Sequence, residues 1–135
     1  ADQVSRRLWF LLAPCAIVLA VVAVSLVGCG DGSVVEEIRH DNGQIKQSKT
    51  MRPGPGGRMV RHGPLIIYYE DGTINEIQPY EHDKLNGTLQ IFYPSGKKKA
   101  ESVWEEGRKV KEWVEWDAKG NVIPPGEGTL NSEEG

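Results

Sequence analysis

The sequence repeats one ten-residue phrase three times, and the copies end 24 residues apart at Gly72, Gly96 and Gly120. The three copies occupy residues 63–72, 87–96 and 111–120. A fixed period of this length is typical of one small supersecondary unit used repeatedly, each copy burying its apolar side chains against the next. We therefore expect a repeat protein rather than an enzyme organised around one catalytic centre.

The segments between the expected turns are rich in aromatic and β-branched residues, which is typical of β-strands. The expected turns lie at Asp71-Gly72, Asn86-Gly87, Ser95-Gly96, Glu106-Gly107 and Lys119-Gly120. Apolar residues occupy both alternating positions of residues 65–69 and 89–93, so both faces of these strands carry apolar groups. No amphipathic helix follows Gly28. The sequence therefore predicts a single sheet with one apolar face left uncovered.

A further hairpin is predicted over residues 34–46, because Asp41-Asn42-Gly43 lies there between two short strand-like runs. Its turn glycine precedes Gly72 by 29 residues instead of 24. The excess is accounted for by the proline- and glycine-rich residues 52–58, which cannot donate a regular ladder of hydrogen bonds. We therefore expect residues 48–62 to form a protruding loop.

The repeated phrase, a glycine, a few apolar residues, two aromatic residues and a second glycine, resembles the MORN-variant repeat of bacterial proteins. The residues that carry the resemblance are Gly63, Tyr68, Tyr69 and Gly72; Gly87, Phe92, Tyr93 and Gly96; and, in the third copy, Trp116 and Gly120. The resemblance covers residues 63–123 and implies a mainly β fold, an open antiparallel β-meander of repeated hairpins that serves as an interaction module. In the third copy Lys111 replaces the leading glycine and Asp117 the second aromatic residue, which suits an end cap.

The N-terminal residues predict a membrane anchor. Residues 8–27 are almost wholly apolar, and at about 1.5 Å per residue a helix of that length spans about 30 Å, the thickness of the hydrocarbon core. Arg6 and Arg7 precede this segment, so the positive-inside rule places residues 1–7 in the cytoplasm. The repeat domain at 34–123, joined by a linker at 28–33, is then periplasmic. This predicts a single-pass protein of a bacterial inner membrane.

A second interpretation of the same segment stays open. Leu26-Val27-Gly28-Cys29 resembles the lipobox of bacterial lipoproteins, which are cleaved before the cysteine and lipidated on it. The apolar run is longer than that of most signal peptides, which favours the retained helix. Cys29 is therefore the candidate lipidation site of the alternative, a lipid-anchored envelope protein.

Small residues form a stripe along the expected transmembrane helix. Ala13, Ala16, Ala20 and Ala23 recur at steps of three and four residues, which places them on one helical face. Such a stripe lets a second transmembrane backbone approach closely. The alternative is that alanine is simply frequent in such segments.

Several function classes are excluded by composition. Beyond the apolar segment, 14 basic residues (16 less Arg6 and Arg7) face 18 acidic residues (19 less Asp2), so a general nucleic-acid binder is not expected. The only cysteines are Cys15 and Cys29, so the domain has no disulfide framework and no cysteine metal site. The three histidines are interpreted as solvated residues in turns and loops; they are His40, His62 and His82. We expect no cofactor, no small-molecule substrate and no catalytic residue.

Two groups of side chains are candidates for binding. The first is a basic cluster for acidic lipid or protein, whose alternative role is to prevent strand-to-strand aggregation; it comprises Lys97, Lys98, Lys99, Arg108, Lys109 and Lys111. The second is an aromatic interaction face, since large aromatic residues often anchor interfaces; it comprises Tyr68, Phe92, Trp104, Trp113 and Trp116.

These features together predict a non-enzymatic, membrane-anchored accessory subunit that contacts a larger inner-membrane protein complex through its helix and its β-domain. A photosynthetic or respiratory complex is the first kind to test. The alternative is a processed envelope lipoprotein that binds glycan or lipid. Residues 124–135 are expected to form a tail that is disordered or lies along a partner.

Overall fold

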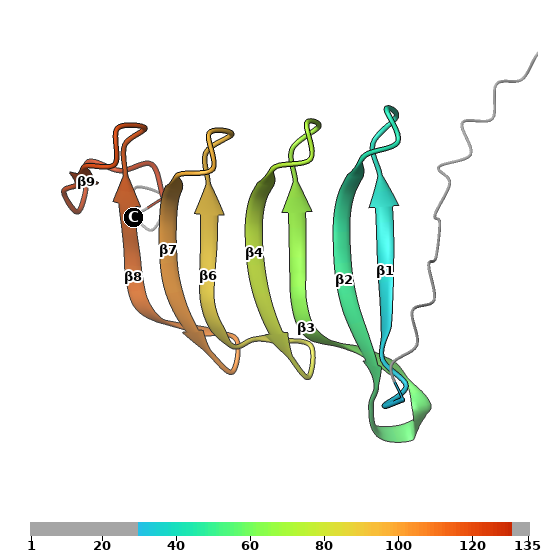
Figure 1. Ribbon diagram of the computed structural model, residues 1–135. Helices are drawn as coiled ribbons and strands as arrows, with labels where there is room; N and C mark the ends of the chain where they lie inside the picture. Colours follow the sequence, from blue (N-terminus) through green and yellow to red (C-terminus); the bar gives the residue numbers. More distant parts are fainter. Residues whose placement is uncertain (1–29, 131–135) are drawn as a thin grey trace, which may run out of the picture.

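A computed structural model describes residues 30–130, and these form one antiparallel β-sheet (Figure 1). The strands are β1 (Val34–Arg39), β2 (Ile45–Pro53), β3 (Met59–Tyr68), β4 (Ile74–Glu81), β5 (Lys84–Leu85), β6 (Gly87–Phe92), β7 (Lys98–Glu105), β8 (Arg108–Trp116) and β9 (Val122–Ile123). Their order in space is β1-β2-β3-β4-β6-β7-β8-β9, and β5 pairs with β4. The predicted mainly β, open antiparallel sheet is confirmed.

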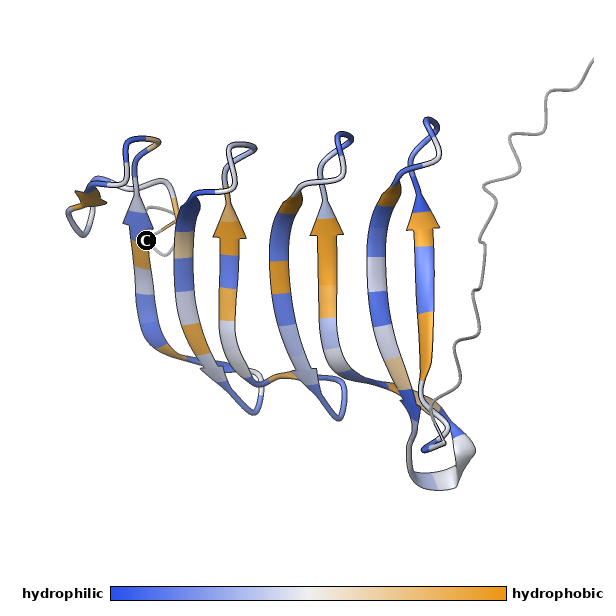
Figure 2. Ribbon diagram, viewed as in Figure 1, coloured by the Kyte–Doolittle hydropathy of each residue, from blue (hydrophilic) through white to orange (hydrophobic). Residues whose placement is uncertain are grey.

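Each long strand pairs with its neighbour in the chain, so the domain is a row of hairpins with upper turns along one edge and lower turns along the other (Figure 1). All described strands lie in this one sheet, and the only helical segment among residues 30–130 is the short 3₁₀ turn η1 (Pro55–Gly57). Hydrophobic and hydrophilic segments alternate along the strands (Figure 2). The described residues therefore contain no second layer that covers the sheet.

The two faces of the sheet follow from the strand register. The row Ile67, Glu76, Ile91, Ala100 and Glu115 consists of directly paired residues on five successive long strands. Cross-strand partners share a face, and this face also carries Leu65, Leu89 and Ser102. Because most of the buried residues of the described chain lie on it, we call it the buried face.

The opposite face is defined by a second paired row. Its members are Ile66, Ile77, Gln90, Glu101 and Val114. None of them is fully buried, and Val114 is 41% exposed. We call this the open face.

The four upper turns share one hydrogen-bond pattern, in which the first residue's NH donates to the carbonyl four residues later and its carbonyl accepts from the turn glycine. The first residues are His40, Tyr69, Tyr93 and Asp117, and the N–O distances are between 2.8 and 3.0 Å. The turn glycines Gly43, Gly72, Gly96 and Gly120 all have positive φ, from 82° to 98°. This confirms the hairpin predicted over residues 34–46 as a divergent first unit with the same turn.

Two of the lower turns are tight and use residues with positive φ. In the first, His82 and Asp83 have φ of 49° and 67°; in the second, Glu106 and Gly107 have 49° and 82°. In each, the NH of the second residue donates to a carbonyl of the preceding hairpin, Arg61 or Leu85. We expected the first of these turns at Asn86-Gly87, and this was wrong. Asn86 lies between β5 and β6, and Gly87 is the first residue of β6.

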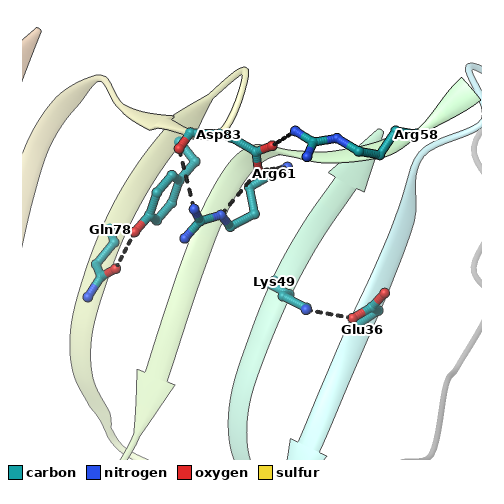
Figure 3. Close-up of polar contacts among 7 residues, drawn as sticks. Glu36, Lys49, Arg58, Arg61, Gln78 and Asp83 are labelled. Atoms are coloured by element: carbon teal, nitrogen blue, oxygen red, sulfur yellow. Dashed lines mark hydrogen bonds and ion pairs between the residues drawn. The ribbon is translucent and has the colours of Figure 1, made fainter. Parts of the chain in front are cut away.

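Asp83 fastens its turn to the neighbouring hairpin (Figure 3). Its carboxylate accepts hydrogen bonds from the Arg61 backbone NH at 2.9 Å and from the Arg58 guanidinium at 2.9 Å. The Arg61 guanidinium also stacks over the Tyr80 ring, 4.1 Å from its centroid. The hydrogen bond from the Arg61 NH, together with the two arginine charges, lowers the pKa of Asp83.

The prediction of a protruding loop at residues 48–62 was wrong. Most of these residues belong to β2 and β3, which continue to pair as far as Pro53 and Met59. Only the five residues from Gly54 to Arg58 form the turn, closed by a hydrogen bond from the Gly54 NH to the Arg58 carbonyl at 2.8 Å. Proline is tolerated here because Pro53 is the last residue of its strand and Pro55 lies in the turn itself.

The chain after β9 folds back onto the sheet, which differs from the tail that we expected. Glu115 is only 4% exposed, and its carboxylate accepts hydrogen bonds from the backbone NH groups of Thr129 at 3.1 Å and Leu130 at 3.0 Å. Gly128 lies against the same carboxylate, where any side chain would clash. Residues 128–130 therefore pack against Glu115 of β8, in the last unit of the sheet.

Candidate interaction surface

An aromatic residue ends the ascending strand of each of three hairpins, at equivalent positions of the repeat. Tyr68, Phe92 and Trp116 follow Ile67, Ile91 and Glu115, which form one paired row on the buried face. Successive side chains of a strand point to opposite faces. The three aromatic residues therefore lie level with one another on the open face, one on every second strand.

Each of these aromatic residues is paired with the first residue of the following strand. Tyr68 pairs with Ile74, Phe92 with Lys98, and Trp116 with Val122. Register shifts between Ile67 and Tyr68 and between Ile91 and Phe92 skip one residue of the following strand, so Ile74 and Lys98 lie opposite the aromatic residues although they are two residues from Glu76 and Ala100. Ile74 is 37% exposed and Val122 62% exposed. We call these six residues the aromatic row; it crosses the open face directly below the upper turns.

A cation is built into the aromatic row. The Lys98 amino group lies 5.7 Å from the centroid of the Trp116 ring and 2.7 Å from the carboxylate of Glu101. The aromatic row is therefore apolar with one positive charge between its second and third aromatic residues. The Glu101 carboxylate compensates this charge from the edge of the row.

The other two residues of the predicted aromatic face lie elsewhere. Trp113 is two residues from Glu115, and Trp104 is two residues from Ser102, so both are on the buried face. The Trp104 indole NH donates to the Ser102 hydroxyl at 2.7 Å. The prediction that all five aromatic residues form one surface was therefore wrong. The odd spacing between Trp113 and Trp116 within one strand already indicated opposite faces.

The predicted basic cluster is divided in two. Lys97, Lys98 and Lys99 lie at the upper end of β7, whereas Arg108, Lys109 and Lys111 lie at the lower end of β8. At about 3.3 Å per residue, the length of the hairpin separates the two groups by about 20 Å. Lys109 also forms an ion pair with Glu112 at 3.1 Å. The structure therefore does not bring these six cations together.

The second aromatic residue of the ten-residue repeat, Tyr69 or Tyr93, forms a hydrogen bond to the next hairpin. The Tyr69 hydroxyl donates to the Phe92 carbonyl, and the Tyr93 hydroxyl donates to the Trp116 carbonyl, both at 2.8 Å. His40 lies at the equivalent position of the first unit, with Nε2 3.3 Å from the Tyr68 carbonyl. In the last upper turn this position is Asp117, whose carboxylate accepts hydrogen bonds within its own turn. These contacts were not foreseen, although the change from tyrosine to aspartate in the last copy was a signal of them.

The histidines are not all isolated in loops. His62 lies within β3, and its ring meets that of His82 edge to face with centroids 4.9 Å apart. Within residues 30–130, however, no group of three or more histidine, cysteine or acidic residues is arranged to hold a metal ion. The histidine pair is a packing contact between β3 and the first tight lower turn.

The membrane-related candidates lie outside the described residues. These are the transmembrane helix at 8–27, the packing stripe Ala13, Ala16, Ala20 and Ala23, and the lipidation site Cys29. Among residues 30–130, no helix is long and apolar enough to cross a membrane.

The stacked hairpins, the shared turn geometry and the hydrogen bonds from each hairpin to the next define a class, the open β-repeat proteins. More particularly, the MORN repeat variant matches residues 61–82 and 85–106, so the chain carries two such repeats within its antiparallel sheet. The matched segments correspond to β3–β4 and to β5–β7, each ending in a tight lower turn. No match to the chain was found among curated proteins or among solved structures.

Proposed function

We propose that the protein is a non-enzymatic accessory subunit, anchored in a bacterial inner membrane by residues 8–27, whose β-domain binds a larger membrane protein complex. The observation that carries the proposal is the aromatic row on the open face. A single-layer sheet that leaves such a row accessible has an apolar surface that folding alone does not use. The regular spacing of the row and its lack of enclosing walls suit an extended protein contact better than a small ligand.

The open face also has the composition of a contact surface. Its aromatic residues are half-buried and held in place by their strands, so little side-chain entropy is lost on binding. Aromatic residues of this kind are frequent binding hot spots. The polar turns above the row would form one side of a rim, whereas the paired row below it combines Gln90 and Glu101 with the apolar Ile66, Ile77 and Val114.

Cross-linking of the protein in its native membranes, followed by mass spectrometry, tests the proposal. We expect cross-links from lysines near the aromatic row, Lys97 and Lys99, to one recurring membrane complex. Phe92→Glu should abolish them, because it places a charge at the centre of the row. Thr88→Glu, on the same face but away from the row, is the matched control and should not. Recovery of the chain only as a free monomer would contradict the proposal.

The alternative proposal is a lipoprotein that binds envelope glycan or lipid, and residues 26–29 favour it because of their resemblance to a lipobox. The intact mass of the protein purified from membranes separates the two. The accessory subunit keeps residues 8–27 and has a mass near 14.9 kDa. The lipoprotein lacks everything before Cys29 and carries a lipid increment there.

A further inference from the structure

We propose that the outer edge of β1 binds an extended strand of another protein, which pairs antiparallel to β1 and adds to the sheet. β1 is the first strand in the order of the sheet, so among residues 30–130 no strand lies beside its outer edge. The backbone NH and carbonyl groups along such an edge are a template for a further strand. This proposal goes beyond the aromatic row, because it concerns the edge of the sheet and not its open face.

One backbone carbonyl shows what a neighbouring strand would supply. In each hairpin, the carbonyl just before the upper turn points away from its own hairpin, because the NH of the same trans peptide group donates inward across the turn. Three of these carbonyls lie 2.8 to 3.3 Å from a side-chain donor of the preceding hairpin, namely those of Tyr68, Phe92 and Trp116. The fourth belongs to Arg39, and the described chain has no preceding hairpin to serve it. A partner would place a donor there.

An apolar side chain of the buried face is exposed at the same edge. Ile38 pairs with Gln47, which pairs in turn with Ile67, so Ile38 extends the row that contains Ile67 and Ile91. Ile67 and Ile91 have strands on both sides and are half-buried, whereas Ile38 has a strand on one side only and is 41% exposed. An apolar residue opposite Ile38 on an added strand would cover it.

The opposite edge of the sheet is closed by the chain itself. There Glu115 replaces the isoleucine of the row and accepts hydrogen bonds from the backbone of residues 128–130. Asp117 replaces the tyrosine donor and accepts hydrogen bonds within its own turn, and β9 is only two residues long. Such caps end a repeat array. Within residues 30–130 only the C-terminal end has one, so β1 is the edge at which the sheet can be extended.

β1 also lacks most of the features that protect an edge strand from pairing. It contains no proline and no lysine, and it pairs with β2 without a bulge from Val34 to Ile38. Its two carboxylates are held within the hairpin, Glu36 by Lys49 and Glu37 by Arg39, both at 2.8 Å. The backbone of β1 is therefore regular enough to accept a partner strand over most of its length.

A second copy of this chain is the less suitable partner. Two antiparallel copies of β1 related by a twofold axis place one residue opposite its own copy, and the central residues of this six-residue strand are Glu36 and Glu37. Like charges directly opposite each other are destabilising, even though each carboxylate also has a cation in its own hairpin. A different strand avoids this by carrying a neutral or basic residue at that position.

Site-specific photo-cross-linking of the full-length protein in intact cells tests the proposal. The photoreactive amino acid benzoylphenylalanine replaces Val34 or Ile38, which lie on the same face of β1, and the linked partner residues are identified by mass spectrometry. We expect both variants to react with one segment of another protein. The Val34 probe should react about four residues C-terminal to the Ile38 probe, because antiparallel partners run in opposite directions.

Val110 provides the matched control, since it is 46% exposed but belongs to β8, at the other end of the sheet. A probe at Val110 should not react with the segment that β1 contacts. Ile38→Lys should reduce the yield from the Val34 probe several-fold, because it puts a charge where an apolar contact is expected. Val110→Lys should leave that yield unchanged.

Several outcomes would overturn the proposal. Linked positions that advance in the same direction as β1 would show a parallel strand, and links to β1 of a second copy would show self-pairing. Links to residues 1–29 of the same chain would show that the chain covers its own edge. Absence of a shared segment, in variants whose circular dichroism matches the wild type, would also overturn it. None of these results depends on the cross-links from Lys97 and Lys99, so the proposed function is tested separately.

Discussion

Asp83 shows how one side chain fastens two hairpins together. Its carboxylate holds the backbone NH of Arg61 and the guanidinium of Arg58, while its own backbone adopts a left-handed conformation with φ of 67°. Asparagine also tolerates that conformation. Asp83→Asn therefore removes the charge without disturbing the turn.

The Asp83→Asn variant should lose stability in a pH-dependent way. The pKa of Asp83 is lowered in the folded protein, chiefly by the hydrogen bond from the Arg61 NH. The carboxylate therefore stabilises the fold above its unfolded pKa, near 4, and this contribution disappears as pH falls through the lower, folded pKa. Urea unfolding should show the variant less stable than the wild type at pH 7, with the difference vanishing toward pH 2. A difference that is independent of pH would contradict this assignment.

Glu115, like Asp83, accepts hydrogen bonds from backbone NH groups, but its side chain is nearly buried. At the equivalent position of the preceding units the buried face carries Ile67 and Ile91, so the last unit has exchanged an apolar residue for an acceptor of backbone hydrogen bonds. Glu115→Ala leaves the NH groups of Thr129 and Leu130 without this acceptor. Loss of a buried partner costs about 1–3 kcal/mol.

In the Glu115→Ala variant we expect the backbone NH groups of residues 128–130 to exchange hydrogen as fast as those of an unfolded chain. The midpoint of urea unfolding should fall. Gly128→Ala should do the same, because its methyl group would clash with the Glu115 carboxylate. Gly126→Ala is not a suitable control, since Gly126 has φ of 88°. Pro125→Ala, at an exposed position, is a suitable control and should leave exchange at residues 128–130 unchanged.

At the level of the hairpin, tyrosine hydroxyls couple each unit to the next. Tyr69→Phe and Tyr93→Phe each remove one hydrogen bond to a neighbouring carbonyl, and each should cost about 0.5–1.5 kcal/mol in the free energy of unfolding. Burial raises the pKa of Tyr69, so its hydroxyl remains a donor at neutral pH. Tyr68→Phe is the matched control. It removes the neighbouring tyrosine hydroxyl, which lies on the open face, and leaves the hydrogen bonds of Tyr69 and Tyr93 in place.

Urea denaturation of the two variants and of the double variant measures this coupling. The two effects should add, since the two bonds involve different carbonyls of different hairpins. An effect of Tyr68→Phe as large as that of Tyr69→Phe would show that packing of the ring, and not the hydroxyl bond, is being measured.

The upper turns depend on the left-handed conformation of their glycines. Gly96 has φ of 82° and open space around its Cα, so a methyl group there meets no neighbour and only the backbone conformation opposes it. We expect Gly96→Ala to cost about 1–2 kcal/mol and Gly96→Asn to cost less. Thermal unfolding followed by circular dichroism checks this. Gly30→Ala, also in open space but without positive φ, should leave the midpoint unchanged.

For the whole molecule, the period of 24 residues predicts that one unit can be removed. Deleting residues 73–96 joins Gly72 to Lys97, so β3 would pair with β7 and the Tyr69 hydroxyl would reach the Trp116 carbonyl in place of Phe92. Because each unit contacts only its neighbours, the shortened sheet should still unfold cooperatively. The slope of its unfolding free energy against denaturant concentration should be smaller, in proportion to the surface that the deletion removes.

Deleting residues 85–96 is the control for this experiment. It removes half a period and leaves an odd strand, so β4 would be joined to β7 out of antiparallel order. Circular dichroism and sedimentation velocity should show a folded monomeric sheet for the first deletion and not for the second. Aggregation of both would contradict the nearest-neighbour description.

The features that local backbone chemistry decides could be predicted from the sequence. Glycines at a fixed period determine the upper turns, because few other residues adopt positive φ readily, and aromatic and β-branched runs between them determine the strands. The resemblance to the MORN repeat variant, the open antiparallel sheet and four of the five turns predicted after residue 62 follow from these signals.

Other features depend on contacts between residues distant in the chain. Pairing with β3 keeps β2 extended as far as Pro53, and packing against β8 draws residues 128–130 onto Glu115. The five aromatic residues that we expected on one surface lie on two faces of the sheet for a related reason. Side chains alternate between faces, and bulges such as the one between Ile91 and Phe92 shift the register, so the face that each aromatic residue occupies is decided by pairing across the sheet. Composition and period predicted the units, and only the tertiary structure decided which side chains share a face, because that depends on register between strands that the local sequence does not specify.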